Sequence, residues 1–356
     1  MSIQASPEAA PDDRVAEAPL LDVRGLTIHL RVRDRVVKAA DDVDLQVAAG
    51  ECVGLVGESG SGKTMVARSV VGLLPTVRLE KRAGEIVLDG TNLLGLRPKE
   101  LRRARQGRVS MIFQEPASYL NPTMRVGRQI AEALTPDVAR GDQTETIRTL
   151  LAQAGLPRGQ RVERRYPHEL SGGMKQRAMI ALALASNPKL LIADEPTTAL
   201  DVTVQAQVLQ TLRHLHQERG MAILLITHDF GVIAEMCDRI YVMYAGQIVE
   251  SADAVTLFTK PRHPYTRLLL DSLPGRRREG SGQILTGSIP DLSMLGQGCR
   301  FASRCPYVEE SCKQDQPLRI RRNGDGVRCI LEDRAEDAGQ VRNTGLSVVE
   351  AGGQSS

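Results

Sequence analysis

The chain of 356 residues has no tryptophan, only four phenylalanines and six tyrosines, and no excess of either charge. Its 46 basic and 43 acidic residues give a formal net charge of +3. No basic run is interleaved with aromatic side chains, so the sequence lacks the electrostatic pattern of a protein that binds nucleic acid. We therefore expect no nucleic-acid partner.

Long apolar runs are also missing. The longest lie around residues 178–185 and 221–226, well short of the ~18–20 residues that a helix needs to cross a bilayer. Residues 1–19 are acidic and rich in alanine and proline, with no apolar stretch typical of a signal peptide, and they read as a disordered lead-in. We expect a cytoplasmic protein that would need separate membrane-spanning subunits for any role at a membrane.

The most informative motif is GESGSGKT at residues 57–64, which matches G-x-x-x-x-G-K-[ST] at every position. An apolar run over 53–56 precedes it and predicts a buried strand, and helical spacing follows from Met65 to Pro75. The glycines allow backbone N–H groups to converge on phosphate oxygens at a helix start. The predicted ATP contacts in this loop are Gly57, Ser59, Gly60, Ser61, Gly62, Lys63 and Thr64, with Lys63 on the β- and γ-phosphates and Thr64 on Mg²⁺.

Two further apolar runs end in polar residues that suit ATP hydrolysis. The run over 190–193 ends at Asp194 and Glu195, and the run over 222–226 is followed by Thr227 and His228. Side chains at the carboxyl ends of parallel strands lie beside the phosphate loop in this architecture. Asp194 is predicted to hold Mg²⁺, Glu195 to polarise the attacking water, and His228 to donate to the γ-phosphate.

A fourth motif, LSGGMKQ at 170–176, precedes a run rich in alanine and leucine that predicts a helix. A serine and two glycines at a helix start form another anion site. With these motifs in this order over about residues 20–250, the chain resembles the ATP-binding cassette (ABC) family. The resemblance implies an α/β P-loop NTPase with the ABC ATPase fold: a RecA-like core with antiparallel β and helical subdomains, plus a small cysteine-containing C-terminal extension.

The resemblance also implies roles that the residues alone do not give. Ser171, Gly172 and Gly173 would contact the ATP held by a second subunit, and the segment 199–201, with Asp201, resembles a loop that crosses the dimer interface. Gln114, after a predicted strand over 109–113, resembles the glutamine that senses Mg²⁺ and the nucleophilic water. The expected catalytic residues are thus Glu195, His228 and Gln114, and the expected Mg²⁺ ligands are Thr64, Gln114 and Asp194.

One family feature is missing. The family stacks the adenine ring on an aromatic residue that precedes the phosphate loop, but the first aromatic residue of this chain is Phe113. His29, Leu30 or Val36 could take its place, and the adenine contact stays unassigned.

The predicted organisation has four parts. Residues 1–19 form the lead-in, 20–257 the ABC ATPase domain with a helical subdomain at about 98–166, 258–332 a C-terminal extension, and 333–356 a polar, disordered tail. Within the ATPase domain, two prolines and an asparagine predict a loop over 115–122. This loop resembles the family surface that receives a coupling helix from the membrane subunit.

The extension begins with HPYTRLLL at 263–270, which resembles the C-terminal region of the ATPases of oligopeptide, dipeptide and nickel importers. It carries Cys299, Cys305, Cys312 and Cys329, separated by five, six and sixteen residues. In a reducing compartment, four clustered thiols favour a metal centre over disulfides, and four thiolates suit either zinc or an iron–sulfur cluster. The resemblance favours a [4Fe–4S] cluster, with zinc or unligated thiols as alternatives. Cys52 and Cys237 are predicted to be buried apolar residues.

These features predict an ATPase subunit of an ABC importer of peptides, dipeptides or a related solute such as nickel. Only one phosphate loop and one LSGGMKQ motif occur, so a second ATPase subunit is needed to complete the sites. Met174 resembles the first, or D-type, of two ATPase subunits, which implies a heterodimer. The other implied partners are two membrane-spanning permease subunits and an extracytoplasmic solute-binding protein, with this chain peripheral on the cytoplasmic face of the inner membrane. The alternatives are a redox-regulated soluble ABC ATPase without a transporter and an exporter subunit, and the 263–270 segment argues against both.

Overall fold

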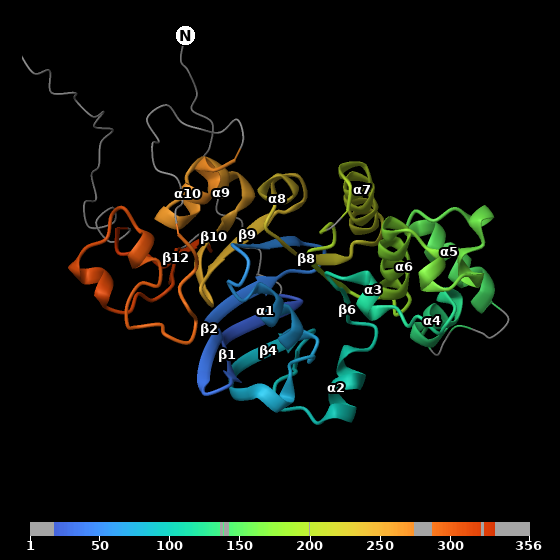
Figure 1. Ribbon diagram of the computed structural model, residues 1–356, viewed down its shortest axis with the longest axis horizontal. Coiled ribbons are helices and arrows are strands. Elements are labelled where there is room, and N and C mark those ends of the chain that lie inside the picture. Colours follow the sequence, from blue (N-terminus) through green and yellow to red (C-terminus); the bar gives the residue numbers. More distant parts are fainter. Residues whose placement is uncertain are drawn as a thin grey trace, which may run out of the picture.

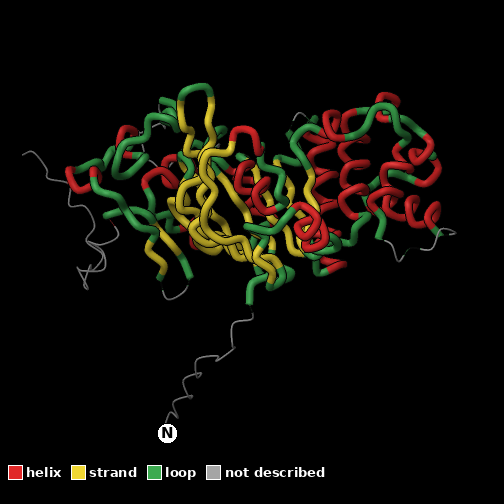
Figure 2. Tube along the Cα trace, turned by 90° about the horizontal axis from the view of Figure 1, so that it is seen from below, coloured by secondary structure: helices red, strands yellow, loops and turns green. Residues whose placement is uncertain are grey.

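Two β-sheets form the centre of the fold, with helices at one end and the C-terminal segment at the other (Figure 1). The computed structural model describes residues 18–135, 138, 142–198, 200–273, 287–321 and 324–331. Residues 1–17 of the expected lead-in and all of the expected tail at 333–356 lie outside the described residues. Seen from below, the strands gather in the middle and the helical lobe lies to one side (Figure 2).

The smaller sheet is antiparallel, with the strand order β2-β1-β4-β5. Its strands are β1 (Leu21–Val32), β2 (Arg35–Val47), β4 (Leu79–Leu88) and β5 (Thr91–Asn92). The larger sheet has the order β11-β12-β10-β9-β3-β8-β7-β6, and its strands from β9 to β6 run parallel. They are β3 (Cys52–Val56), β6 (Val109–Ile112), β7 (Leu190–Asp194), β8 (Ala222–Thr227), β9 (Arg239–Tyr244), β10 (Gln247–Asp253), β11 (Arg319–Ile320) and β12 (Gly326–Val327).

The parallel strands are buried on both faces, which explains why they read as continuous apolar runs rather than as an alternating pattern. In β8, Leu224 and Ile226 face a core shared with the smaller sheet and helix α1 (Lys63–Val70). Ile223 and Leu225 face the opposite core, shared with the helical lobe. Cys52 and Cys237 are both buried, as predicted, with their sulfur atoms 3.8 Å apart.

The helical lobe contains the segment that begins with LSGGMKQ (Figure 1). Its helices are α3 (Pro116–Tyr119), α4 (Val126–Ala133), α5 (Gln143–Gln153) and α6 (Gly172–Leu184), and α7 (Val202–Arg219) packs against α6. The range 98–166, expected to form the helical subdomain, also contains α2 (Pro98–Arg105) and the edge strand β6, which corresponds to the strand predicted over 109–113. Short 3₁₀ segments occur at Thr76–Arg78, Arg158–Gln160, Val162–Arg164, Pro167–Glu169, Ala302–Arg304 and Glu310–Lys313.

The prediction of a loop over 115–122 was wrong in part, because α3 forms one helical turn there. Pro116 is the first helical residue. A proline at that position has a φ angle suited to the helix and lacks only an N–H that would have no partner within it, so it starts the turn instead of preventing it.

The C-terminal segment, described over residues 258–273, 287–321 and 324–331, is attached to the larger sheet. It follows α8 (Phe230–Met236), β9, β10 and α9 (Ala254–Thr259), and it begins with α10 (Pro264–Asp271). Strand β12 pairs antiparallel with β10. Arginine ion pairs add further attachments, which join Arg300 to Asp41, Arg328 to Asp42 and Arg35 to Asp291.

Glu250 of β10 connects this segment to the sheet from inside the protein. Its carboxylate is buried and accepts the backbone N–H groups of Arg262 and His263 at 2.7 and 2.9 Å. Burial raises the pKa of this carboxyl group, against the opposing effect of these hydrogen bonds. The Glu250 side chain therefore holds the turn that leads into α10 against β10.

We expect Glu250→Ala to lower the free energy of unfolding by about 2–4 kcal/mol, because one buried and one partly buried N–H group would lose this carboxylate as acceptor. Denaturant unfolding of the two proteins measures the difference. Glu85→Ala is the matched control, because Glu85 is half exposed and its nearest ion-pair contact, with Arg24, is 3.6 Å long. Equal stability of Glu250→Ala and Glu85→Ala would contradict the assignment.

Candidate nucleotide site

The phosphate loop connects the end of β3 to the start of α1, as the sequence predicts. Gly62 has a φ of 106°, and a Cβ atom there would lie 2.0 Å from the carbonyl oxygen of Ala39 in β2. A Cβ at Gly57 would lie 2.1 Å from the carbonyl oxygen of Met243 in β9. Gly60 has a φ of 82°, but a Cβ there would meet nothing within 4 Å. Two of the glycines are therefore needed for close backbone packing, and the third for its backbone angle.

Lys63 lies buried under this loop. Its ammonium donates to the carbonyl oxygens of Gly57 and Glu58 at 2.8 and 2.9 Å. Burial lowers the pKa of Lys63, and the nearby carboxylates of Glu195, Asp194 and Glu58 oppose this change. A positive charge held inside a curved glycine loop is the arrangement that binds a polyphosphate.

The neighbouring strand supplies the residues expected to bind Mg²⁺. The Thr64 hydroxyl donates to the carboxylate of Asp194, the last residue of β7, at 3.1 Å. Burial raises the pKa of Asp194. Among the described residues, no group of three or more His, Cys, Asp or Glu side chains could hold a metal ion. The pair Thr64 and Asp194 fits Mg²⁺ in a nucleotide site, because this ion usually takes only one or two protein ligands and completes its shell with phosphate oxygens and water.

Glu195 is at the centre of a polar cluster. Its carboxylate accepts from the Gln114 amide at 2.9 Å and from the Thr198 hydroxyl at 2.8 Å, and Nδ1 of His228 lies 3.5 Å away. The structure thus brings together all three of the predicted catalytic residues. The φ of Glu195 is 47°, an uncommon angle for a residue with a side chain, and backbone strain of this kind gathers at functional sites.

Thr198 is a contact that the sequence analysis missed. Its place three residues after Glu195, in the turn that follows β7, could have indicated this contact. The turn brings the two residues together, and the Thr198 N–H also donates to the Glu195 carbonyl oxygen at 3.2 Å.

The other predicted ATP contacts are on the opposite lobe. Ser171 caps α6 by accepting from the Met174 N–H at 3.3 Å, and Asp201 caps α7 by accepting from the Val204 N–H at 2.9 Å. A Cβ at Gly173 would lie 2.7 Å from Val204, so the two helix starts pack closely. Within the described part of the chain, neither capping side chain bonds to the phosphate loop, and Ala199 lies outside that part.

His29, one candidate for the adenine contact, is engaged elsewhere. Its ring is mostly buried on β1 and its Nε2 lies 2.9 Å from the Asp41 carboxylate. Because His29 is paired with Asp41, Leu30 and Val36 remain as the candidates for the contact with the adenine ring.

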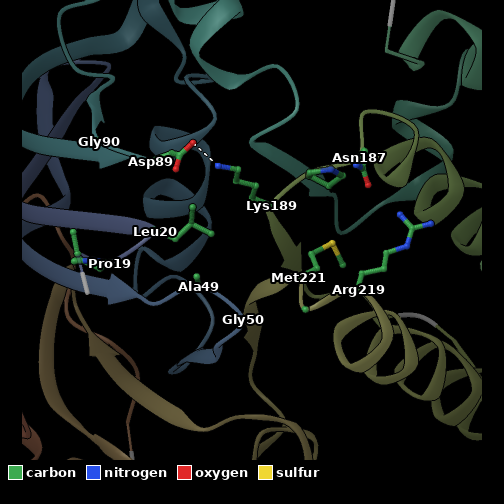
Figure 3. Close-up of a pocket in the computed structure, with 13 residues that line it drawn as sticks. Pro19, Leu20, Ala49, Gly50, Asp89, Gly90, Asn187, Lys189, Arg219 and Met221 are labelled. Carbon is green, nitrogen blue, oxygen red and sulfur yellow. Dashed lines mark hydrogen bonds and ion pairs between the residues drawn. The ribbon is translucent and has the colours of Figure 1, made fainter. Parts of the chain in front are cut away.

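A cavity of about 500 Å³ lies at the other end of the parallel strands (Figure 3). Its lining includes Gly50, Lys189 and Met221, which come just before β3, β7 and β8, and the Lys189 ammonium donates to Asp89 at 2.8 Å. Ligands of parallel sheets bind beyond the carboxyl ends of the strands. The cavity is at the amino ends, so it is not the nucleotide site.

The four C-terminal cysteines line one small cavity of about 10 Å³, together with Phe301 and His263. Burial raises the pKa of the Cys299, Cys305 and Cys329 thiols, and each of these thiols is also affected by at least two of the other cysteines. The predicted gathering of these side chains is therefore present, although the structure identifies no metal-binding group among its described residues.

A phosphate loop at the end of β3, an acidic pair at the end of β7 and a separate helical lobe define a P-loop ATPase of the cassette class. The family model described as "ABC transporter" matches residues 40–198, and that described as "Oligopeptide/dipeptide transporter, C-terminal region" matches 249–312.

Relatives align along nearly the whole chain. The probable peptide ABC transporter ATP-binding protein y4tR of Sinorhizobium fredii is 46% identical over 84% of this chain and 90% of its own length. The oligopeptide transport ATP-binding protein AppD of Bacillus subtilis is 44% identical over 90% and 99%. A solved dimeric, post-hydrolysis structure of the cassette MJ0796, bound to ADP and Pi, is similar with a TM-score of 0.59 and 26% identity over 66% of this chain and 98% of that one.

The chain belongs to the ATP-binding proteins of ABC transporters that carry the oligopeptide/dipeptide C-terminal region, and it is an ABC ATPase. The predicted family and fold are confirmed. No helix in the described ranges is both long and apolar enough to span a membrane.

We expect Gly62→Ala to weaken the binding of Mg-ATP at least about tenfold more than Gly60→Ala does, because only the first substitution places a Cβ against a backbone oxygen. Both residues have positive φ angles, so Gly60→Ala controls for backbone strain. Titration of each full-length variant with a fluorescent ATP analogue measures the two dissociation constants. An equal increase in the dissociation constant of both variants would show that the close packing of Gly62 against Ala39 does not shape the loop.

Proposed function

We propose that this chain is the ATP-hydrolysing subunit of an ABC importer that takes up peptides, dipeptides or a related solute. The observation that carries the proposal is the cluster around Glu195, next to a phosphate loop, in a chain that aligns nearly end to end with proteins named for peptide transport. The relatives from Brucella species, named as putative peptide import ATP-binding proteins, support the same substrate class.

In this proposal, Lys63 and the loop N–H groups bind the triphosphate, and Thr64 and Asp194 bind Mg²⁺, with Gln114 as a further ligand. Glu195 orients and polarises the attacking water. Gln114 and Thr198 hold its carboxylate in place. His228 lies on the same side and is largely exposed, so it is available to donate to the γ-phosphate.

A second ATPase subunit completes each site in this proposal. Ser171, Gly172, Gly173 and Asp201 lie at two adjacent helix starts and, within the described residues, form no hydrogen bond with the phosphate loop of their own chain. Helix starts bind anions, so this surface suits the ATP of a partner. The solved cassette similar to this one is described as dimeric. Met174 favours a heterodimer with a distinct ATPase.

Two permease subunits and an extracytoplasmic solute-binding protein are the other proposed partners, with this chain peripheral on the cytoplasmic face of the inner membrane. The proposed contact with the permease is α3. Tyr119 of this helix is 43% exposed and stacks on Phe113, with ring centroids 3.7 Å apart. Phe113 directly precedes Gln114, so movement of α3 would reach the Glu195 cluster. The relatives named above give no support to a soluble ATPase without a transporter.

We further propose that the four C-terminal cysteines bind a [4Fe–4S] cluster, with zinc as the alternative. Four thiols from separate turns converge on one site, and the donor set suits either metal centre. Zinc would be held by the same four thiolates and would supply a structural cross-link. The cavity of about 10 Å³ must widen to admit a cluster. A bound cluster would cross-link the turns of this segment.

Glu195→Gln tests the catalytic assignment. We expect it to bind Mg-ATP like the wild type but to slow turnover by on the order of 10²-fold or more, because the amide cannot act as a base. Lys63→Ala should instead raise the dissociation constant for ATP. Steady-state hydrolysis and nucleotide titration of the full chain separate the two effects. Near-normal turnover of Glu195→Gln would remove Glu195 from the role of base.

Protein purified without oxygen tests the metal assignment. We expect iron and acid-labile sulfide in a ratio near one, with a broad visible absorption band that fades when Cys305 and Cys312 are both replaced by Ser. Replacement of Cys52, which lies outside the site, is the control. Zinc without iron would favour the alternative, and a protein without either metal would leave the thiols unligated.

A further inference from the structure

Glu58, the second residue of the phosphate loop, is held in place through three of its own groups: its carbonyl oxygen, its backbone N–H and its carboxylate. Its carbonyl oxygen accepts from Lys63 at 2.9 Å, its backbone N–H donates to the Tyr265 hydroxyl at 3.0 Å, and its carboxylate pairs with Arg304 at 3.1 Å. Lys63 belongs to the loop, but the other two partners come from the C-terminal segment, more than 200 positions away in the sequence. The loop is therefore positioned in part by residues outside the nucleotide motifs.

Tyr265 can hold the Glu58 N–H because its own position is rigid. It is fully buried in α10, with its ring centroid 4.6 Å from that of Tyr244 and 5.4 Å from that of Phe301. Burial raises the pKa of the Tyr265 hydroxyl, which therefore stays neutral. A neutral hydroxyl can accept the Glu58 N–H without adding negative charge near the phosphates.

Arg304 is similarly constrained. Its side chain is 8% exposed, and its guanidinium lies 5.7 Å from the centre of the Tyr244 ring. One of its nitrogen atoms donates to both Glu58 carboxylate oxygens, at 3.1 and 3.2 Å, and to the Tyr244 hydroxyl at 3.3 Å. This ion pair is partly shielded from water, so its charges interact more strongly than those of an exposed pair.

The charge of Glu58 makes this pairing relevant to nucleotide binding. A carboxylate at the second position of the phosphate loop repels a triphosphate, unless a cation compensates for it. Lys63 contacts the Glu58 carbonyl oxygen, and we expect its ammonium to turn toward the phosphates when ATP binds. Arg304 then remains as the cation in contact with the Glu58 carboxylate.

We propose that Tyr265 and Arg304 are positioning residues of the ATP site: they fix Glu58 and neutralise its charge, so the C-terminal segment sets the affinity of the phosphate loop for ATP. The proposal rests on the ATP site described above and goes beyond it, because it gives a nucleotide-binding role to residues that do not touch the nucleotide.

A double-mutant cycle between Arg304 and Glu58 tests this proposal on the full-length chain. We expect Arg304→Met to raise the dissociation constant for Mg-ATP about tenfold, with less than about a twofold change in the rate at saturating ATP. In Glu58→Gln the loop carries no negative charge, so Arg304→Met added to it should change the dissociation constant less than about threefold. Arg304→Lys keeps the cation and should remain close to the wild type. Tyr265→Phe, which removes only the hydroxyl, should raise the constant about three- to tenfold.

Lys313→Ala is the matched control, because it removes another ion pair of the C-terminal segment, the exposed pair with Glu310, which involves no residue assigned to the nucleotide site. We expect it to leave ATP binding unchanged. Thermal unfolding of each variant identifies any that fails to fold, and in that case Tyr265→Phe carries the test.

The outcomes separate this proposal from the proposed function. A wild-type chain that does not bind Mg-ATP would overturn the proposed function. Normal ATP affinity in Arg304→Met, or in Tyr265→Phe if the first variant does not fold, would overturn only the positioning role. An equal loss from Arg304→Met in the presence and in the absence of the Glu58 charge would also overturn it, because the arginine would then act on the fold and not through Glu58.

Discussion

The register of the parallel strands is the constraint on which the site depends. Val56 at the end of β3 is level with Thr227 of β8, and Asp194 at the end of β7 is level with Ile226. Each strand is buried on both faces, so a shift of one residue would move every side chain to the wrong core. The phosphate loop, the acidic pair and His228 follow these strand ends and are thereby brought to one edge of the sheet. Burial of ordinary aliphatic side chains thus fixes the position of the polar ones.

The same constraint explains how much could be predicted. The strands ending at Val56 and Asp194 were predicted to within a residue, because a doubly buried strand appears as an unbroken apolar run ended by glycine or charge. The cluster of Gln114, Glu195 and His228 followed from the family resemblance together with these strand ends. The short helix α3 was missed because prolines indicate a loop unless they stand at a helix start.

The contacts of Glu58 could not be predicted for a different reason. They depend on where α10 and residue 304 come to lie against the sheet, and sequence spacing carries no information about side-chain contacts between such distant segments. Thr198 lies only three residues from Glu195 and was within reach of local reasoning. The motifs therefore predict which residues contact the nucleotide, whereas the residues that hold the motifs in place emerge only from the fold.

The pairing of β12 with β10 has a consequence for any truncation of this protein that removes the C-terminal segment. Strand β10 has β9 on one side and the two residues of β12 on the other, so a chain ended near residue 257 would leave one edge of the sheet open. An open edge of this kind pairs readily with strands of other molecules. The shortened protein would tend to self-associate, even though every nucleotide motif would still be present in it.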